Sequence, residues 1–401
     1  MKAIGERGNL LILSLSLGVV MLGYGIVMPI MPFYVDSMGG SAVTFGLLVA
    51  ISPLIQLVAS PLWGSVSDRR GRKPILALGL LGYGISMLAF GLATELWMLF
   101  VARGVGALLS SATLPTTMAY VSDSTAEQDR GGGMGMLGGV IALGAVLGPA
   151  LGGVLGSDSL SRPFLLTAAV CLLTVLLVLR FLPETLSAET LRQAAAAARP
   201  DAQGLRQALF GPLSALLFMA FLVSFGLTNF QGIYGYYALK KFGYGTQEVG
   251  WILTIAGTVS ALTQGALTGP LTRRWGEATV IKATLLASAL TFALLLTAKN
   301  LTTVLLTTAL FTLPNALLHP AVMALTSKRA GAQQGAAMGL NNSFHSLGRV
   351  VGPIWAGFAF DLNYKVPYLS GAAIMFVGFL ASLVWVAQER RDVAVPRRSG
   401  L

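Results

Sequence analysis

Three residues of one long apolar segment carry side chains that can bind a ligand or move a proton. Asn341, His345 and Arg349 follow one another at intervals of four, so they lie along one face of a predicted helix. A guanidinium binds anionic groups, and an imidazole can change charge near neutral pH. At the centre of a membrane helix, a charge costs about 2.5–3.5 kcal/mol. We therefore expect Arg349 to face a water-filled cavity lined also by His345 and His319. Pairing with backbone carbonyls or a helix dipole, and snorkelling to the interface, are the open alternatives.

Other polar side chains fall inside apolar segments in the same way. The complete set that we predict to bind substrate is Arg103, Asn229, Gln231, Asn315, His319, Asn341, His345 and Arg349. For Arg103 a structural role is an equal alternative. For Gln56 we expect a hydrogen bond to a neighbouring backbone carbonyl rather than to a ligand.

The segments that must position these side chains are long and apolar. Of the 401 residues, 55% are hydrophobic and only 11% are charged, and the mean hydropathy is +0.74. Soluble domains carry about a quarter charged residues, so these charges are too few to cover a soluble surface. The apolar runs are continuous rather than alternating, which predicts transmembrane helices and not a β-barrel. Twelve spans are expected near residues 9–35, 43–67, 74–92, 97–122, 133–156, 162–182, 213–240, 246–271, 278–298, 301–326, 335–359 and 366–387.

The distribution of basic residues predicts the orientation of these spans. Twenty of the 27 Lys and Arg residues fall on the side that holds both termini, and five fall on the other side. Cytoplasmic loops carry such an excess, so both termini are expected in the cytoplasm. The net charge of +11 reflects this bias and suits anionic lipid headgroups. The cations are spread over short segments, which argues against nucleic acid binding.

The sequence lacks the residues that several other classes of protein need. Cys171 is the one cysteine and there are two histidines, so we expect no disulfide, no metal and no cofactor. The sequence contains no Walker-type phosphate loop and no Gly-x-Ser-x-Gly elbow. We therefore predict neither an ATP-driven pump nor an enzyme.

Internal repetition divides the chain into two parts. The stretch "GSVSDRRGRKP" from Gly64 recurs in degraded form as "GPLTRRWGEAT" from Gly269, and two more stretches recur at offsets of 205 and 204 residues. These repeats predict an all-α integral membrane protein, with twelve transmembrane helices in two six-helix pseudo-repeats around a central cavity. The expected parts are a first half at 1–182, a cytoplasmic linker at 183–209, a second half at 210–387 and a cytoplasmic tail at 388–401.

Two glycine-containing motifs bear on how the helices move and pack. The turn after the second span contains Gly64, Asp68, Gly71 and Arg72, and we expect Arg72 to find a partner in Asp123. The alternative is that this turn is merely a basic cytoplasmic loop with no further role.

In the fifth span, a ridge of small residues predicts a surface for close helix packing, and a proline adds a bend. This ridge contains Gly144, Gly148, Pro149 and Gly152.

Both motifs resemble those of the major facilitator superfamily, and most closely those of its twelve-span drug/proton antiporters, such as tetracycline and quinolone exporters. The turn is similar to the family's signature loop, and the ridge to its antiporter motif. The resemblance implies that Gly64, Asp68, Gly71 and Arg72 form a cytoplasmic latch that opens as the halves rock. "VARGVGA", centred on Arg103, is similar to a third family motif but has Gly106 where the family has glutamine.

The resemblance also implies an intramembrane carboxylate, which this sequence lacks. None of the sixteen acidic residues lies deep in a span; Asp36 and Asp361 come nearest, each at the outer end of its helix. We therefore hypothesise that His345 or His319 takes the place of the carboxylate as the carrier of the coupled proton.

The motifs and the repeat favour a secondary active transporter that works by alternating access. We expect multidrug-type efflux of amphiphilic small molecules, coupled to protons, by a monomer in the plasma membrane. One alternative is a transporter of a specific organic anion or lipid-like metabolite with a basic central site. A remote alternative is a non-transporting membrane sensor.

Overall fold

A computed structural model describes residues 6–125, 128–185, 213–330 and 334–385. In these ranges the chain is helical and contains no strand, as the continuous apolar runs predict. The helices are α1 (Glu6–Ser37), α2 (Ala42–Arg70), α3 (Arg72–Gly91), α4 (Leu96–Ser110), α5 (Thr113–Ser124), α6 (Arg130–Asp158), α7 (Arg162–Phe181), α10 (Ser214–Gln231), α11 (Tyr234–Phe242), α12 (Thr246–Leu262), η1 (Thr263–Leu267), α13 (Thr268–Trp275), α14 (Glu277–Leu295), α15 (Leu301–Ala330), α16 (Gln334–Leu362) and α17 (Val366–Trp385).

Within the described residues, every predicted span is helical, but three are not single α-helices. The fourth span is α4 followed by α5, with the break at Ser111 and Ala112. Pro115 then lies in the first turn of α5, where a missing amide hydrogen costs nothing. The seventh span is α10 followed by α11, and the eighth contains a turn of π-helix, η1.

Within the described residues, eleven helical stretches are long and apolar enough to cross a membrane. The predicted eleventh span, α16, is not among them, although its 29 residues give it the length. It is the helix that carries Asn341, His345 and Arg349. The chain is a multi-pass membrane protein, and α16 is the predicted span that falls short of the apolar character of the other eleven.

The chain packs as two compact units. The first unit contains α1 to α7, the segment Gln231–Thr258 and the segment Arg349–Tyr364. The second contains α10 as far as Phe230, the segment Val259–Gly348, and α17. The predicted division along the chain stays a prediction, and most of its linker and tail, at 186–212 and 386–401, lies outside the described residues.

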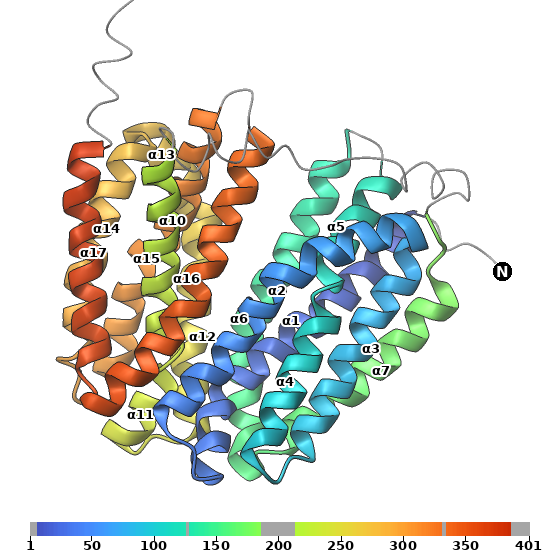
Figure 1. Cartoon of the computed structure of the whole chain (residues 1–401), viewed down its shortest axis with the longest axis horizontal. Coiled ribbons are helices and arrows are strands. Elements are labelled where there is room, and N and C mark those ends of the chain that lie inside the picture. The colour runs from blue at the N-terminus through green and yellow to red at the C-terminus, as the bar shows by residue number, and fades with distance from the viewer. Residues whose placement is uncertain (1–5, 126–127, 186–212, 331–333, 386–401) are drawn as a thin grey trace, which may run out of the picture. The chain divides into compact units, whose positions relative to one another are not determined.

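Equivalent helices pack in the same pattern inside the two units. In the first, α3 packs against α4 and α7; in the second, α14 packs against α15 and α17 (Figure 1). The turns before α3 and α14 also match. Gly71 has φ 102° and ψ 153°, and Gly276, 205 residues later, has φ 77° and ψ 152°. Such positive φ values favour glycine, which explains why glycine survives at both positions of the degraded repeat.

One end of the first unit is joined by a polar contact between distant parts of the chain. Lys240 of α11 donates to the Asp36 carboxylate of α1 at 2.7 Å, and the Tyr236 hydroxyl donates to the same oxygen at 3.0 Å. Asp36 thus ties α11 to α1. These charge-assisted hydrogen bonds give the Asp36 carboxylate a structural role, so its presence at the helix end does not require a ligand.

Candidate functional site

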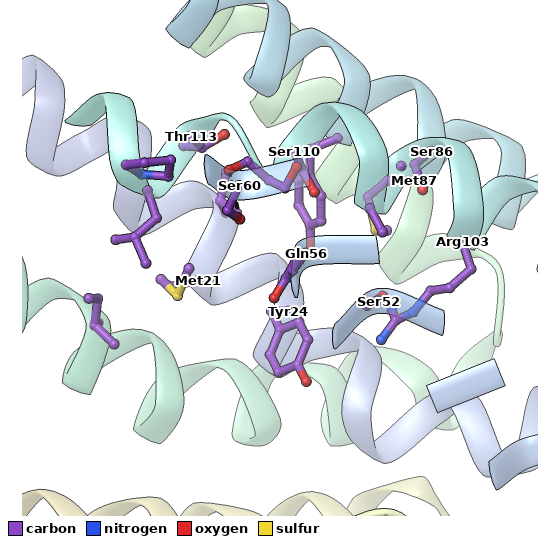
Figure 2. Close-up of a pocket in the computed structure, with 18 of the residues that line it drawn as sticks. Met21, Tyr24, Ser52, Gln56, Ser60, Ser86, Met87, Arg103, Ser110 and Thr113 are labelled. Carbon is purple, nitrogen blue, oxygen red and sulfur yellow. Dashed lines mark hydrogen bonds between the residues drawn. The ribbon is translucent and has the colours of Figure 1, made fainter. Parts of the chain in front are cut away.

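A cavity of about 450 Å³ lies inside the first unit. Its walls come from α1 to α6, together with Arg349 of α16. Figure 2 labels lining residues of α1 to α5. This volume is in the range of small-molecule binding sites. The residues that line it are Val20, Met21, Tyr24, Ser52, Gln56, Ser60, Tyr83, Ser86, Met87, Arg103, Gly106, Ala107, Ser110, Ser111, Thr113, Leu114, Pro115, Met118, Ile141 and Arg349.

Arg103 is buried in the wall of this cavity. The residue is only 7% exposed, its Nε has no hydrogen-bond partner, and its guanidinium lies 5.9 Å from the centre of the Tyr24 ring. Figure 2 shows the side chain reaching from α4 towards Ser52 of α2. A cation over an aromatic face is stabilised, but the ring leaves the N–H donors unsatisfied. Arg103 is therefore a buried charge that retains hydrogen-bonding capacity.

Arg349 lines the same cavity and is partly exposed. Among the described residues, no ion pair or hydrogen bond involves its side chain. We expected His345 and His319 to line the same cavity as Arg349, but neither histidine is among the residues that line this one, so the three residues do not form one wall here. No Asp or Glu is among the lining residues, so the ionised groups of this wall are two arginines.

Sequence reasoning missed most of the cavity wall. Gln56, expected to bond a backbone carbonyl, makes no hydrogen bond to any described residue and lines the cavity. Tyr24 and Tyr83 also lie there, and the Tyr83 hydroxyl is buried without a partner. Only Arg103 and Arg349 carried a usable signal for this wall, because a charge in an apolar span is costly. The lining methionines carried none, since Met is ordinary in a membrane helix.

The second unit holds five of the remaining predicted residues. The Asn229 and Asn315 amides donate to the carbonyls of Pro367 and Phe311 at 2.6 and 2.7 Å. The Asn341 amide lies 3.3 Å from the Thr326 hydroxyl. All three side-chain carbonyl oxygens are buried without a partner. Each asparagine therefore has a structural bond and one unused acceptor.

His319 and His345 lie side by side in the second unit. Their ring centroids are 4.3 Å apart, with the planes tilted by 58°. The structure thus brings together the two histidines that the sequence singled out. Gln231, the eighth predicted residue, is exposed at the last position of α10.

The predicted latch is an ion-pair cluster around Arg72. Its Nε donates to Asp123 at 2.9 Å, and its Nη1 donates to Asp68 and, at 2.7 Å, to the Ser67 hydroxyl. The Arg72 side chain is 9% exposed, against 30% for Asp123 and 48% for Asp68. The expected contact of Arg72 with Asp123 is present.

Glu184, just after α7, was not anticipated. It accepts hydrogen bonds from the Arg72 and Lys73 backbone amides at 2.8 and 3.1 Å and so caps the start of α3. Glycine is favoured at Gly71 by its positive φ of 102°, and an added Cβ would also displace the Glu184 carboxylate, which would lie 2.5 Å from it. At Gly64, by contrast, an added Cβ meets no described residue within 4 Å.

The glycine ridge of α6 lies against α1. A Cβ on Gly148 would lie 2.6 Å from the Gly25 Cα, and one on Gly144 would lie 2.6 Å from the Met21 Cβ. Gly152 and Pro149 are buried on the same helix, against Ile26 and Gly25 respectively. The backbones of α1 and α6 therefore approach as closely as glycine permits.

Comparison with known proteins places the sequence in a known group. The family model described as Major Facilitator Superfamily matches residues 13–228 and 216–401. Multidrug resistance protein 2 of Bacillus subtilis is 32% identical over 396 residues, which cover 98% of this chain and 99% of the relative. Quinolone resistance protein NorA of Staphylococcus aureus is 25% identical over 376 residues, covering 94% and 96%.

Solved structures show the same fold at lower identity. The nucleoside transporter NupG has a TM-score of 0.78 at 14% identity, with 95% of this chain and 99% of NupG covered. The human organic anion transporter MFSD10 has a TM-score of 0.65 at 22% identity, with 94% and 100% covered.

Proposed function

Since the chain belongs to the major facilitator superfamily, we propose that it exports amphiphilic small molecules by alternating access, with the cavity of the first unit as part of the substrate path. Membership makes the chain a membrane transporter; the substrate class and the direction are our proposal. The cavity is the observation that carries it. Its wall mixes apolar side chains, such as Met21 and Met87, with isolated polar groups, which suits molecules with an apolar body and a polar end.

The names of the relatives support export rather than uptake. A multidrug resistance protein covers nearly the whole chain at 32% identity, and a quinolone resistance protein is also similar. Resistance by a membrane transporter requires removal of the compound from the cell. We therefore assign outward transport, with no enzymatic step.

Coupling to protons is part of the proposal and rests on the second unit. His319 and His345 form a contacting pair within a membrane-spanning region, and histidine is the side chain that most readily changes charge near neutral pH. No carboxylate lines the cavity of the first unit. We assign proton uptake and release to this histidine pair.

The orientation in the membrane is part of the proposal and is supported by the sequence. The excess of Lys and Arg on one side supports cytoplasmic termini in the plasma membrane. A cysteine at Lys299 on a Cys171→Ser background should react with an impermeant maleimide in intact cells, and one at Arg130 should not. The reverse labelling pattern would show that the termini lie outside the cell.

We propose that the working unit is a monomer. Native mass spectrometry should then give the mass of a single subunit, and a stable dimer would refute the proposal.

Transport in proteoliposomes tests the function and its coupling together. A fluorescent amphiphile should move faster with a pH gradient than without one. In His319→Gln and His345→Gln the gradient should lose its effect, while exchange of substrate across the membrane without a gradient continues. If neither wild-type flux nor exchange exceeds that of empty liposomes, the proposed function is wrong. If both variants keep the full response to the gradient, the histidine pair is not the coupling site.

A further inference from the structure

We propose that the molecules bound in the first-unit cavity carry an anionic group, which Arg103 and Arg349 bind, while the methionine and aromatic side chains hold the apolar body. This inference rests on the proposed function and adds the charge of the substrate. It separates this chain from exporters that select cationic compounds by an intramembrane carboxylate.

Arg103 has hydrogen-bonding capacity that the protein does not use. A guanidinium carries five N–H donors, and Nε of this buried side chain has no partner. No ion pair or side-chain hydrogen bond involves Arg103 among the described residues, and Tyr24 offers it only a ring face. A buried charge without an acceptor is costly. A bound carboxylate, sulfonate or phosphate would supply the missing acceptor, and with bidentate geometry.

The charge of the whole wall also favours an anion. Arg103 and Arg349 come from different helices, α4 and α16, and line one cavity. No carboxylate lines the cavity to offset them. Two like charges on one wall create a potential that attracts an anion and repels a cation. A cationic amphiphile would have to enter against both.

The remainder of the wall is suited to an apolar body. Met21, Met87 and Met118 line the cavity, and methionine adapts to ligands of different shape. Tyr24 and Tyr83 add aromatic surface. The volume of about 450 Å³ admits a molecule of drug size rather than an inorganic ion alone. The chemistry that fits is an organic anion with a sizeable apolar part.

The test uses three dyes that share one fluorophore and differ in charge. Dansylglycine is anionic, dansylamide is neutral and dansylcadaverine is cationic at neutral pH. Each is titrated into the purified full-length protein in lipid nanodiscs, and the signal from empty nanodiscs is subtracted. Wild-type protein should bind dansylglycine about tenfold or more tightly than dansylamide, and dansylcadaverine most weakly.

Variants assign the preference to the two arginines. Arg103→Gln and Arg349→Gln should each reduce the affinity for dansylglycine about tenfold and leave that for dansylamide within about twofold. Arg103→Lys should keep part of the preference, because it keeps the charge and loses only the fork of donors. Arg180→Gln, at an exposed site at the end of α7, removes the same charge outside the cavity and should change nothing.

The outcomes separate this inference from the function on which it rests. If dansylamide binds and is transported but dansylglycine shows no preference over dansylcadaverine, the anion site is refuted and the exporter stands. The anion site is also refuted, again without harm to the exporter, if both Arg→Gln variants keep the wild-type preference. If no dye binds or is transported by wild-type protein, the exporter and the anion site are refuted together.

Discussion

Arg72 and Glu277 occupy equivalent positions of the two halves, 205 residues apart, and make the same contact with opposite charges. Arg72 pairs with Asp123 at 2.9 Å, and Glu277 pairs with Lys328, which is 205 residues after Asp123, at 2.5 Å. Both pairs join the start of one helix to the end of another within their own unit. The repeat has therefore kept the position of an ion pair while reversing its polarity.

The two pairs differ in how well water screens them, and this sets their expected contribution to stability. Arg72 is 9% exposed along its side chain, whereas Lys328 is 64% exposed. Asp123→Ala should lower the free energy of unfolding by about 1–3 kcal/mol, because it leaves a buried Nε unpaired. Lys328→Ala should cost about 0.2–1 kcal/mol at most, as for other exposed pairs. Thermal unfolding in detergent compares them, and a larger loss for Lys328→Ala would contradict this ranking.

The latch role that the family resemblance implies for Asp68 makes a separate prediction about transport. Asp68 contacts Arg72 but is about half exposed, so Asp68→Asn should leave the protein folded and inserted. We expect turnover to fall severely, since the charge cluster that closes and reopens would lack one acid. Flux per molecule in proteoliposomes measures this. Unchanged flux in a well-expressed Asp68→Asn variant would contradict the latch role and mean that the ion-pair cluster around Arg72 is only structural.

Gly148 tests the contact between α1 and α6. An added Cβ would meet the Gly25 Cα at 2.6 Å, and backbone cannot move aside as a side chain can. We expect Gly148→Ala to cost about 1–3 kcal/mol through overpacking and to reduce transport, and Gly148→Leu to abolish it. Gly139→Ala and Gly139→Leu are the matched controls on the same helix, where an added Cβ meets nothing within 4 Å. Equal activity of all four variants would mean that close packing here is dispensable.

The sequence was most informative where charge or glycine carried the signal. The pairing of Arg72 with Asp123 was predictable, because a basic turn and an acid at the end of the fourth span have few other partners. The turn at Gly71 was predictable from two glycines and an acid at fixed spacing. Glu184 was not, since nothing in a single sequence says that the end of α7 reaches the start of α3.

The site was only partly predictable, for a physical reason. Arg103 and Arg349 stood out because a charge in an apolar span is expensive. Sequence spacing put Arg349 on one helix face with His345, but it could not show that the chain divides between them into separate compact units. Gln56 was expected to bond a backbone carbonyl, and Tyr24 was not singled out, because a neutral polar side chain in a membrane helix commonly has such a structural partner. Only the geometry shows that both line the cavity.

Filling the cavity is the sharpest test of whether substrate passes through it. Ser110 lines the cavity. Leu108, two residues earlier on α4, is exposed and is not among the residues that line the cavity. We compare Ser110→Trp with Leu108→Trp in proteoliposomes, using the flux of a fluorescent amphiphile and the melting temperature of each variant. We predict that Ser110→Trp loses nearly all flux while it melts close to the control, and that Leu108→Trp transports as wild type does. Wild-type flux in a folded Ser110→Trp protein would contradict the passage of substrate through this cavity.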